Sequence, residues 1–179
     1  MFCFSRRWAL LVAIVLAVIA SIFVYNVLRI ECHFYPLLSR AAEERDAAIL
    51  VCMGTGDTGM ERCAVQQQQA FIAAGLDSVL VCHRNSYIAK TALARKLPVV
   101  ICSNFGICSK KFAWLPGVQR AVGMLAKRFD KRLLAVQCNM PRELFACKRV
   151  LKKSGVPVIF TQHTMHNVVS TAVRRASDG

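Results

Sequence analysis

Three glycines with the spacing of a phosphate-binding loop follow a short apolar run near residue 50. Gly54, Gly56 and Gly59 form a GxGxxG pattern between a strand-like run at residues 48–53 and a helical stretch at residues 60–74. Glycines let the backbone approach a ligand phosphate, and the N-terminus of the following helix offers free N–H groups and a partial positive charge. The pattern predicts a site for a phosphate-bearing ligand. A tight strand–helix turn without a ligand is the alternative.

The elements that must position this loop alternate along the chain. Short apolar runs predict strands at residues 48–53, 78–82, 98–102, 133–138 and 156–161. Helices are predicted at residues 60–74, 87–96 and 142–153, with another ending near residue 129. Strands that alternate with helices of this length form a parallel sheet covered on both faces. With right-handed crossovers, residues 48–179 are predicted to be an α/β, Rossmann-like, doubly wound domain. The glutamine tract at residues 66–69 is expected to be a solvated helix face.

Ligands of open α/β sheets bind beyond the carboxyl ends of the strands, so the residues that follow each strand are candidates for binding. Arg84 follows the second predicted strand and Asn139 follows the fourth. A dinucleotide-binding enzyme usually has an acidic residue where Arg84 stands, whereas an arginine suits NADP. An NADP-binding oxidoreductase therefore stays open as an alternative, although no Tyr-x-x-x-Lys pair follows.

An uncharged apolar stretch precedes the domain, at residues 8–28. A helix of this length spans roughly 30 Å, the thickness of a bilayer's hydrocarbon core. Residues 1–7 form a basic flank that contains Arg6 and Arg7, and residues 29–47 form a juxtamembrane connector. The stretch is predicted to be a single transmembrane anchor. A signal peptide cleaved after Ala20 is the competing interpretation.

The net charge indicates which kinds of partner the protein could bind, and the cysteine content indicates the compartment in which its globular part lies. The net charge of +14 fits anionic lipid, a phosphorylated substrate or nucleic acid. Because no aromatic-rich basic motif of the RNA-binding kind occurs, membrane lipid is predicted as a partner and nucleic acid is not. The nine cysteines are odd in number and contain no CxxC pair, which argues against a disulfide framework and a zinc site. We expect no metal, reduced thiols, and a globular part in the cytoplasm.

Three segments in order resemble a known family. Gly59-Met-Glu61-Arg62 opens a helix that ends in Ala-Ala-Gly75, residues 82–89 and 94–100 follow, and residues 154–164 end in Gln-His163-Thr. Over residues 48–170 the chain resembles the N-terminal, acceptor-binding domain of a family 4 glycosyltransferase of GT-B fold. Thr58 departs from the family's pattern, which usually has a second adjacent glycine there.

The resemblance implies two facing Rossmann-like domains with the active site in the cleft between them. Gly54, Gly56, Gly59 and Glu61 would then lie near the substrate and its phosphates, together with Arg84 and Asn139. His163 matches the histidine that the family places beside the reacting sugar, and is the implied catalytic residue. A nucleotide sugar is implied as co-substrate, with no cofactor.

The family's donor-binding domain carries a Glu-x7-Glu motif, and this chain has no such pair. We therefore expect the donor-binding half to be missing, which leaves a split subunit with a separate donor-binding partner, a truncated product or a relic. Activity of the chain alone is not expected. The predicted function is that of a membrane-anchored glycosyltransferase, or its acceptor-binding half, acting on a lipid-linked or surface-polysaccharide acceptor. A non-enzymatic anchored module that binds lipid or a protein is a further alternative.

Overall fold

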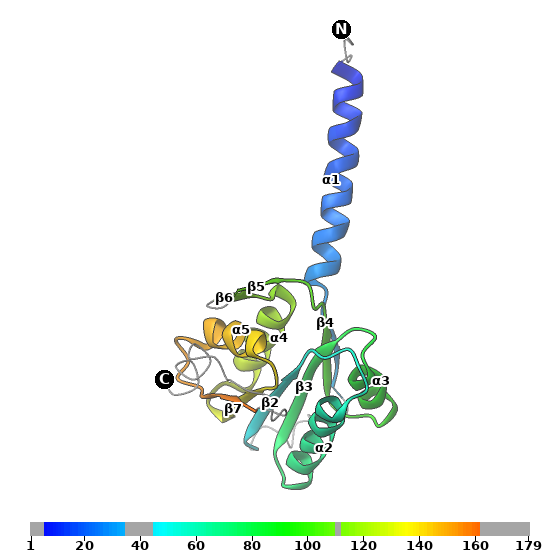
Figure 1. Ribbon diagram of the computed structural model, residues 1–179. Helices are drawn as coiled ribbons and strands as arrows, with labels where there is room; N and C mark the ends of the chain where they lie inside the picture. The colour runs from blue at the N-terminus through cyan, green and yellow to red at the C-terminus, as the bar shows by residue number, and fades with distance from the viewer. Residues whose placement is uncertain (1–5, 35–44, 110–111, 162–179) are drawn as a thin grey trace.

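The computed structural model describes residues 6–34, 45–109 and 112–161, which form one long helix and an α/β domain (Figure 1). The helix, α1 (Arg6–Leu28), projects away from the domain and meets it only at its last turns. Its segment Trp8–Leu28 is long and apolar enough to cross a membrane, with a mean hydropathy of 2.7. This rests on length and composition, which a signal sequence can share.

Within the described residues, six strands form one sheet of order β1-β4-β3-β2-β7-β8. All neighbours pair in parallel except the edge strand β1, which is antiparallel to β4. Their bounds are β1 (Glu31–His33), β2 (Ala47–Cys52), β3 (Asp77–His83), β4 (Val99–Cys102), β7 (Leu133–Cys138) and β8 (Val158–Phe160). The parallel order around β2 is that of a Rossmann-like sheet, as the sequence predicted.

Helices cover both faces of the sheet, so its central strands are buried on both sides. One face carries α2 (Gly59–Ala73) and α3 (Tyr87–Ala94), and the other carries α4 (Pro116–Phe129) and α5 (Pro141–Leu151). In β2, Ile49 and Val51 pack into the core on the α4–α5 side, whereas Leu50 and Cys52 pack into the core on the α2–α3 side. This alternation with a period of two, buried throughout, explains why β2 reads as a continuous apolar run.

Two elements were not predicted from the sequence. Strand β1 lies within the segment expected to be a connector, and a short hairpin of β5 (Ile107–Ser109) and β6 (Phe112–Trp114) precedes α4. Both are built from three-residue strands, which are too short to show a period in the sequence. The charged end of the connector, at residues 40–44, lies outside the described residues.

The glutamine tract corrects one expectation, because it is not simply a solvated face. Gln68 is fully buried, and its Nε2 donates to the carbonyl oxygens of Ser78 (3.2 Å) and Pro98 (2.6 Å). Those carbonyls belong to the segments that enter β3 and β4. One amide of the tract therefore ties α2 to the sheet, while its neighbour Gln66 is exposed.

Five of the cysteines are buried in the domain core: Cys52, Cys82, Cys102, Cys138 and Cys147. All eight cysteines in the part of the chain that the structure describes are free thiols. Burial raises the pKa values of Cys52 and Cys82 to about 12. These buried thiols stay protonated and pack as small hydrophobic side chains.

Candidate functional site at the carboxyl edge of the sheet

The glycine loop, residues 54–59, follows β2 and is closed from within by its own helix. Glu61 lies one turn into α2, is only 3% exposed, and accepts a hydrogen bond from the Thr58 backbone N–H at 3.1 Å. Its carboxylate also contacts the Thr58 hydroxyl. A Cβ at Gly54 would overlap this carboxylate. A side chain at residue 54 would therefore displace the Glu61 carboxylate, which accepts the Thr58 N–H at the start of α2 as part of a capping box.

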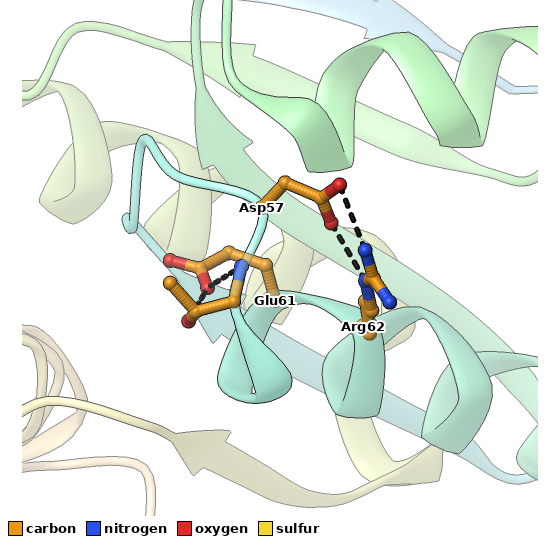
Figure 2. Close-up of polar contacts among 4 residues, drawn as sticks. Asp57, Glu61 and Arg62 are labelled. Carbon is orange, nitrogen blue, oxygen red and sulfur yellow. Dashed lines mark hydrogen bonds and ion pairs between the residues drawn. The ribbon is translucent and has the colours of Figure 1, made fainter.

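The neighbouring charges of the loop are paired with each other (Figure 2). The Arg62 guanidinium binds the Asp57 carboxylate through two parallel contacts, Nε to Oδ1 at 2.8 Å and Nη2 to Oδ2 at 3.0 Å. Both side chains are exposed. The hydrogen bonds from Arg62 lower the pKa of Asp57. The Gly-x-Glu-Arg segment thus uses both charged residues to hold the shape of the loop.

The other two glycines leave the surface of the loop open. A Cβ at Gly59 would meet nothing within 4 Å, and at Gly56 it would meet only the Thr58 methyl group, at 3.3 Å. Neither glycine has a positive φ, so local backbone conformation does not demand glycine at either position. The open surface at the N-terminus of α2 is compatible with the approach of a phosphate.

Beneath the glycine loop, the buried carboxylate of Glu143 joins the ends of β2 and β7. It lies in the first turn of α5 and accepts hydrogen bonds from the backbone N–H groups of Met53 (2.6 Å), Asn139 (2.9 Å) and Met140 (2.9 Å). Burial raises the pKa of Glu143 to about 7, against the lowering effect of these three donors. Glu143 fixes the residue immediately before Gly54, and so sets where the glycine loop begins.

Asn139 is placed at the carboxyl edge but points inward. Its side-chain amide donates to the Val51 carbonyl at 3.2 Å, and the residue is 5% exposed. Its backbone N–H also binds Glu143. In this structure Asn139 joins β7 to β2 rather than presenting its amide to an open surface.

Arg84 lies in a separate part of the edge, in a pocket of about 310 Å³ where α1 meets the ends of β3 and β4. We call this the junction pocket. Its lining residues are Phe23, Asn26, Val27, His83, Arg84, Asn85, Ser103 and Phe105. One wall comes from the last turns of α1 and is largely apolar, and the other residues come from the domain and are polar apart from Phe105. The pocket therefore has the mixed character of a site for an amphipathic ligand.

Several nitrogen atoms around this pocket are buried without a hydrogen-bond partner among the described residues. They include His83 Nδ1, Arg84 Nε and, at the start of α5, Arg142 Nε. Burial lowers the pKa of His83, and the positive charges of Arg142 and Arg84 lower it further. Glu31 provides the one described counter-charge on Arg84, at 3.3 Å from its Nη2, and shares it with Arg29 at 3.1 Å.

The end of α1 is packed onto the domain at the same place. The Phe23 ring meets the Phe105 ring edge-on at 5.1 Å, and Phe105 meets Trp114 at 6.3 Å. Arg120 of α4 donates to the Leu28 carbonyl at 3.0 Å. Val27 is 8% exposed, unlike the residues before it in α1. The carboxyl ends of β3 and β4 therefore lie directly beside the end of the candidate membrane span.

The predicted site residues thus fall into two groups. Gly54, Gly56, Gly59 and Glu61 share the glycine loop, and Asn139 is linked to them through Glu143, while Arg84 belongs to the junction pocket. His163 lies outside the described residues.

Sequence reasoning missed Glu143, although Pro141 followed by a glutamate two residues later is a helix-start signal. It also missed His83 and Arg142, which have no motif around them. Among the described residues no group of three or more His, Cys, Asp or Glu side chains could hold a metal ion.

The described fold is that of a Rossmann-like domain of the kind found in the GT-B fold. The structure is similar to the crystal structure of MurG from Acinetobacter baumannii, with a TM-score of 0.54 and 12% sequence identity. The match covers 74% of this chain but 39% of the MurG chain, so this chain spans about two fifths of that protein's length. MurG is a GT-B glycosyltransferase of family 28, so the likeness supports the GT-B fold and not family 4 in particular. Neither a protein-family model nor a curated protein sequence matches this chain.

Proposed function

We propose that this protein is the membrane-anchored, acceptor-binding half of a glycosyltransferase, which receives a lipid-linked acceptor at the carboxyl edge of its sheet. The observation that carries the proposal is the packing of the end of α1 beside that edge, through Phe23–Phe105 and Arg120–Leu28. In a Rossmann-like sheet this is the edge where ligands bind. An acceptor whose lipid tail stays in the bilayer would reach it without leaving the membrane.

The same packing supports retention of α1 as an anchor rather than its removal as a signal peptide. Cleavage after Ala20 would remove only part of the helix, leaving Phe23, Asn26 and Val27 on the domain as the start of the chain. These residues line the junction pocket. We infer a single-pass protein whose domain faces the cytoplasm, where its free, buried thiols stay reduced. Protease protection of sealed membranes tests this: a domain shielded from added protease in right-side-out vesicles agrees, and digestion there contradicts it.

In this proposal the donor is bound by a domain other than the described one. The chain spans about two fifths of the MurG chain, and catalysis by positioning needs groups on both sides of the cleft. A donor-binding domain that closes over the glycine loop, whether on the same polypeptide or on a partner, would bring a nucleotide sugar to the acceptor. The open surface of Gly56 and Gly59 supports this place for the sugar-nucleotide phosphates.

Deletion and complementation test the function directly. In the native cell, loss of this chain should cause an unglycosylated lipid acceptor to accumulate, and the full-length chain should restore its glycosylation. Membranes from the two strains are incubated with tritiated nucleotide sugars and cytosol, and label is counted in the lipid-extractable fraction. Equal labelling with every donor in both strains would overturn the proposal.

A further inference from the structure

We propose that the junction pocket binds the phosphate group of a membrane lipid, with Arg84 as its principal ligand and His83 as a second donor. The proposal deepens the function above, because it names where the acceptor's lipid phosphate would sit. It rests on that function only in treating α1 as a retained membrane span.

Two nitrogen atoms of the pocket lack an acceptor in the part of the chain that the structure describes, although Arg84 Nη2 lies 3.3 Å from the Glu31 carboxylate. His83 Nδ1 and Arg84 Nε are buried and have no hydrogen-bond partner among the described residues. Buried polar groups in proteins are rarely left unpaired, since each costs free energy comparable to a lost hydrogen bond. A phosphate offers several oxygen acceptors, and a guanidinium fork binds two of them at once.

The charge of the pocket points to an anion of more than one negative charge. His83 and Arg84 line the pocket, and Glu31 is shared between Arg84 and Arg29. Burial, and then the positive charges of Arg142 and Arg84, lower the pKa of His83. Binding of an anion would relieve the repulsion among the cations. A phosphate monoester or diphosphate carries the charge that this cluster can neutralise, which a zwitterionic headgroup does not.

The walls of the pocket point to a lipid rather than to a soluble phosphate. Phe23 and Val27 come from the last two turns of α1, within roughly 10 Å of the end of a helix that rises about 5.4 Å per turn. This is the depth at which headgroups begin. Phe105, Ile107 and Trp114 of the nearby hairpin region are also exposed, and β5 and β6 lie beside the base of α1 (Figure 1). Exposed aromatic side chains at this level are typical of a membrane interface.

The probe is dioleoyl phosphatidic acid, added to full-length protein in phosphatidylcholine nanodiscs. The chain has two tryptophans, so Trp8→Phe leaves Trp114, whose ring contacts Phe105 of the pocket, as the reporter. Dioleoylglycerol has the same chains without the phosphate, and inorganic phosphate has no chains. We expect saturable binding of phosphatidic acid, at least ten-fold weaker binding of inorganic phosphate, and no fluorescence response to dioleoylglycerol. Equal responses to phosphatidic acid and inorganic phosphate, or to phosphatidic acid and dioleoylglycerol, would overturn the lipid-phosphate site.

Variants separate this pocket from general attraction to a basic protein. Arg84→Ala should weaken binding of phosphatidic acid roughly ten-fold or more, since it removes charge-assisted hydrogen bonds. Arg95→Ala is the matched control, because Arg95 is exposed, bonds Gln69, and lies at the end of α3 on the opposite edge of the sheet. It should leave binding unchanged. Equal weakening by both variants would reduce the effect to overall charge and overturn the proposal.

A variant that gains affinity guards against loss of folding. Glu31→Gln removes the carboxylate that competes for Arg84 but keeps an oxygen acceptor, so phosphatidic acid should bind several-fold more tightly. A misfolded protein would not show this, and unchanged or weaker binding by a folded Glu31→Gln variant would contradict the site. The binding assays and the deletion experiment test the two proposals separately. If phosphatidic acid binds as expected but deletion does not change lipid glycosylation, the proposed function is wrong and the binding site stands. If the full-length chain restores glycosylation but binding does not depend on Arg84, the binding site is wrong and the proposed function stands.

Discussion

The glycine loop and the junction pocket both lie where strands of the sheet end, but their charged groups are used in opposite ways. In the loop, Glu61 caps its own helix and Asp57 pairs with Arg62, so each charge has a partner from the loop itself. In the pocket, nitrogen atoms of His83 and Arg84 are buried and have no hydrogen-bond partner within residues 6–34, 45–109 and 112–161. The charged residues of the glycine loop and its helix, which form the more recognisable motif, thus mainly stabilise the loop itself. The less recognisable cluster retains donors for a ligand.

The difference can be tested first at Glu143, which supports the loop from below. Glu143→Ala leaves the N–H groups of Met53 and Met140 without their acceptor, whereas the Asn139 N–H keeps the Val51 carbonyl at 3.3 Å. At about 1–3 kcal/mol for each of these two groups, the free energy of unfolding should fall by about 2–6 kcal/mol. Urea unfolding of the full-length protein in detergent, with reductant present, measures this.

Arg142→Ala is the control for that measurement. Arg142 stands next to Glu143 but only approaches the Met53 carbonyl, at 3.4 Å, so its removal should cost less than about 1 kcal/mol. Equal losses in the two variants would mean that the N–H groups are not what Glu143 stabilises.

Dependence on pH gives the next largest expected effect. Burial raises the pKa of Glu143 from 4.5 to about 7, so the folded protein holds a proton that the unfolded chain releases. The resulting stabilisation is complete below pH 4.5 and is lost as the pH rises through 7. A difference of about 2.5 pH units, at 1.4 kcal/mol per unit, corresponds to about 3 kcal/mol.

Urea midpoints at pH 5, 6, 7 and 8 measure this loss, and Glu143→Gln, which does not titrate, should show a flatter profile. His83 changes the free energy of unfolding with pH in the opposite sense, because its pKa is lowered. This contribution is the same in the wild-type protein and in Glu143→Gln. The difference between the two profiles therefore reports Glu143. Parallel profiles would contradict the raised pKa.

Gly54→Ala tests whether the first glycine of the loop is reserved for Glu61. Its Cβ would overlap the Glu61 carboxylate, and overpacking of this kind costs about 1–3 kcal/mol. In a Glu61→Ala background the clash disappears, so a double-mutant cycle of unfolding free energies should show coupling of about 1 kcal/mol or more. Gly56→Ala is the control, since its Cβ meets only a methyl group. Additive effects of Gly54→Ala and Glu61→Ala would break the link between them.

The order of strands and helices could be predicted from the sequence because each central strand is buried on both faces. Runs such as Ala47–Cys52 and Val99–Cys102 are wholly buried and therefore uninterrupted by polar residues. Strand β1 could not be predicted, because its partner β4 lies some 70 residues further along the chain and its three residues carry no pattern. The same holds for Gln68, whose buried contacts come from two other elements.

For the candidate site, the sequence predicted which edge of the sheet carries it, but not which contacts its residues make. The glycine spacing pointed to the loop after β2, and position after a strand pointed to Arg84. The contact of Glu61 with Thr58 is local, because the Thr-x-x-Glu spacing is that of a capping box. That Arg142 of α5 lies near His83 and Arg84 follows from packing between distant segments. Such juxtapositions depend on tertiary structure, and no local pattern of residue types encodes them.

Gly59→Ala gives the smallest expected effect on stability and the sharpest test of the open part of the loop. Its Cβ would meet nothing within 4 Å, and alanine restricts the unfolded chain more than glycine does. The free energy of unfolding should therefore stay the same or rise by up to about 1 kcal/mol. Gly75→Ala, at the other end of α2, is the matched control. It also meets no atom, but its φ of 87° should make alanine cost about 1 kcal/mol or more. If the donor's phosphates approach this loop, Gly59→Ala should restore lipid glycosylation to the deletion strain several-fold less well than the wild-type protein. Full restoration would leave the glycine loop as a structural turn, and the junction pocket as the ligand site of this edge.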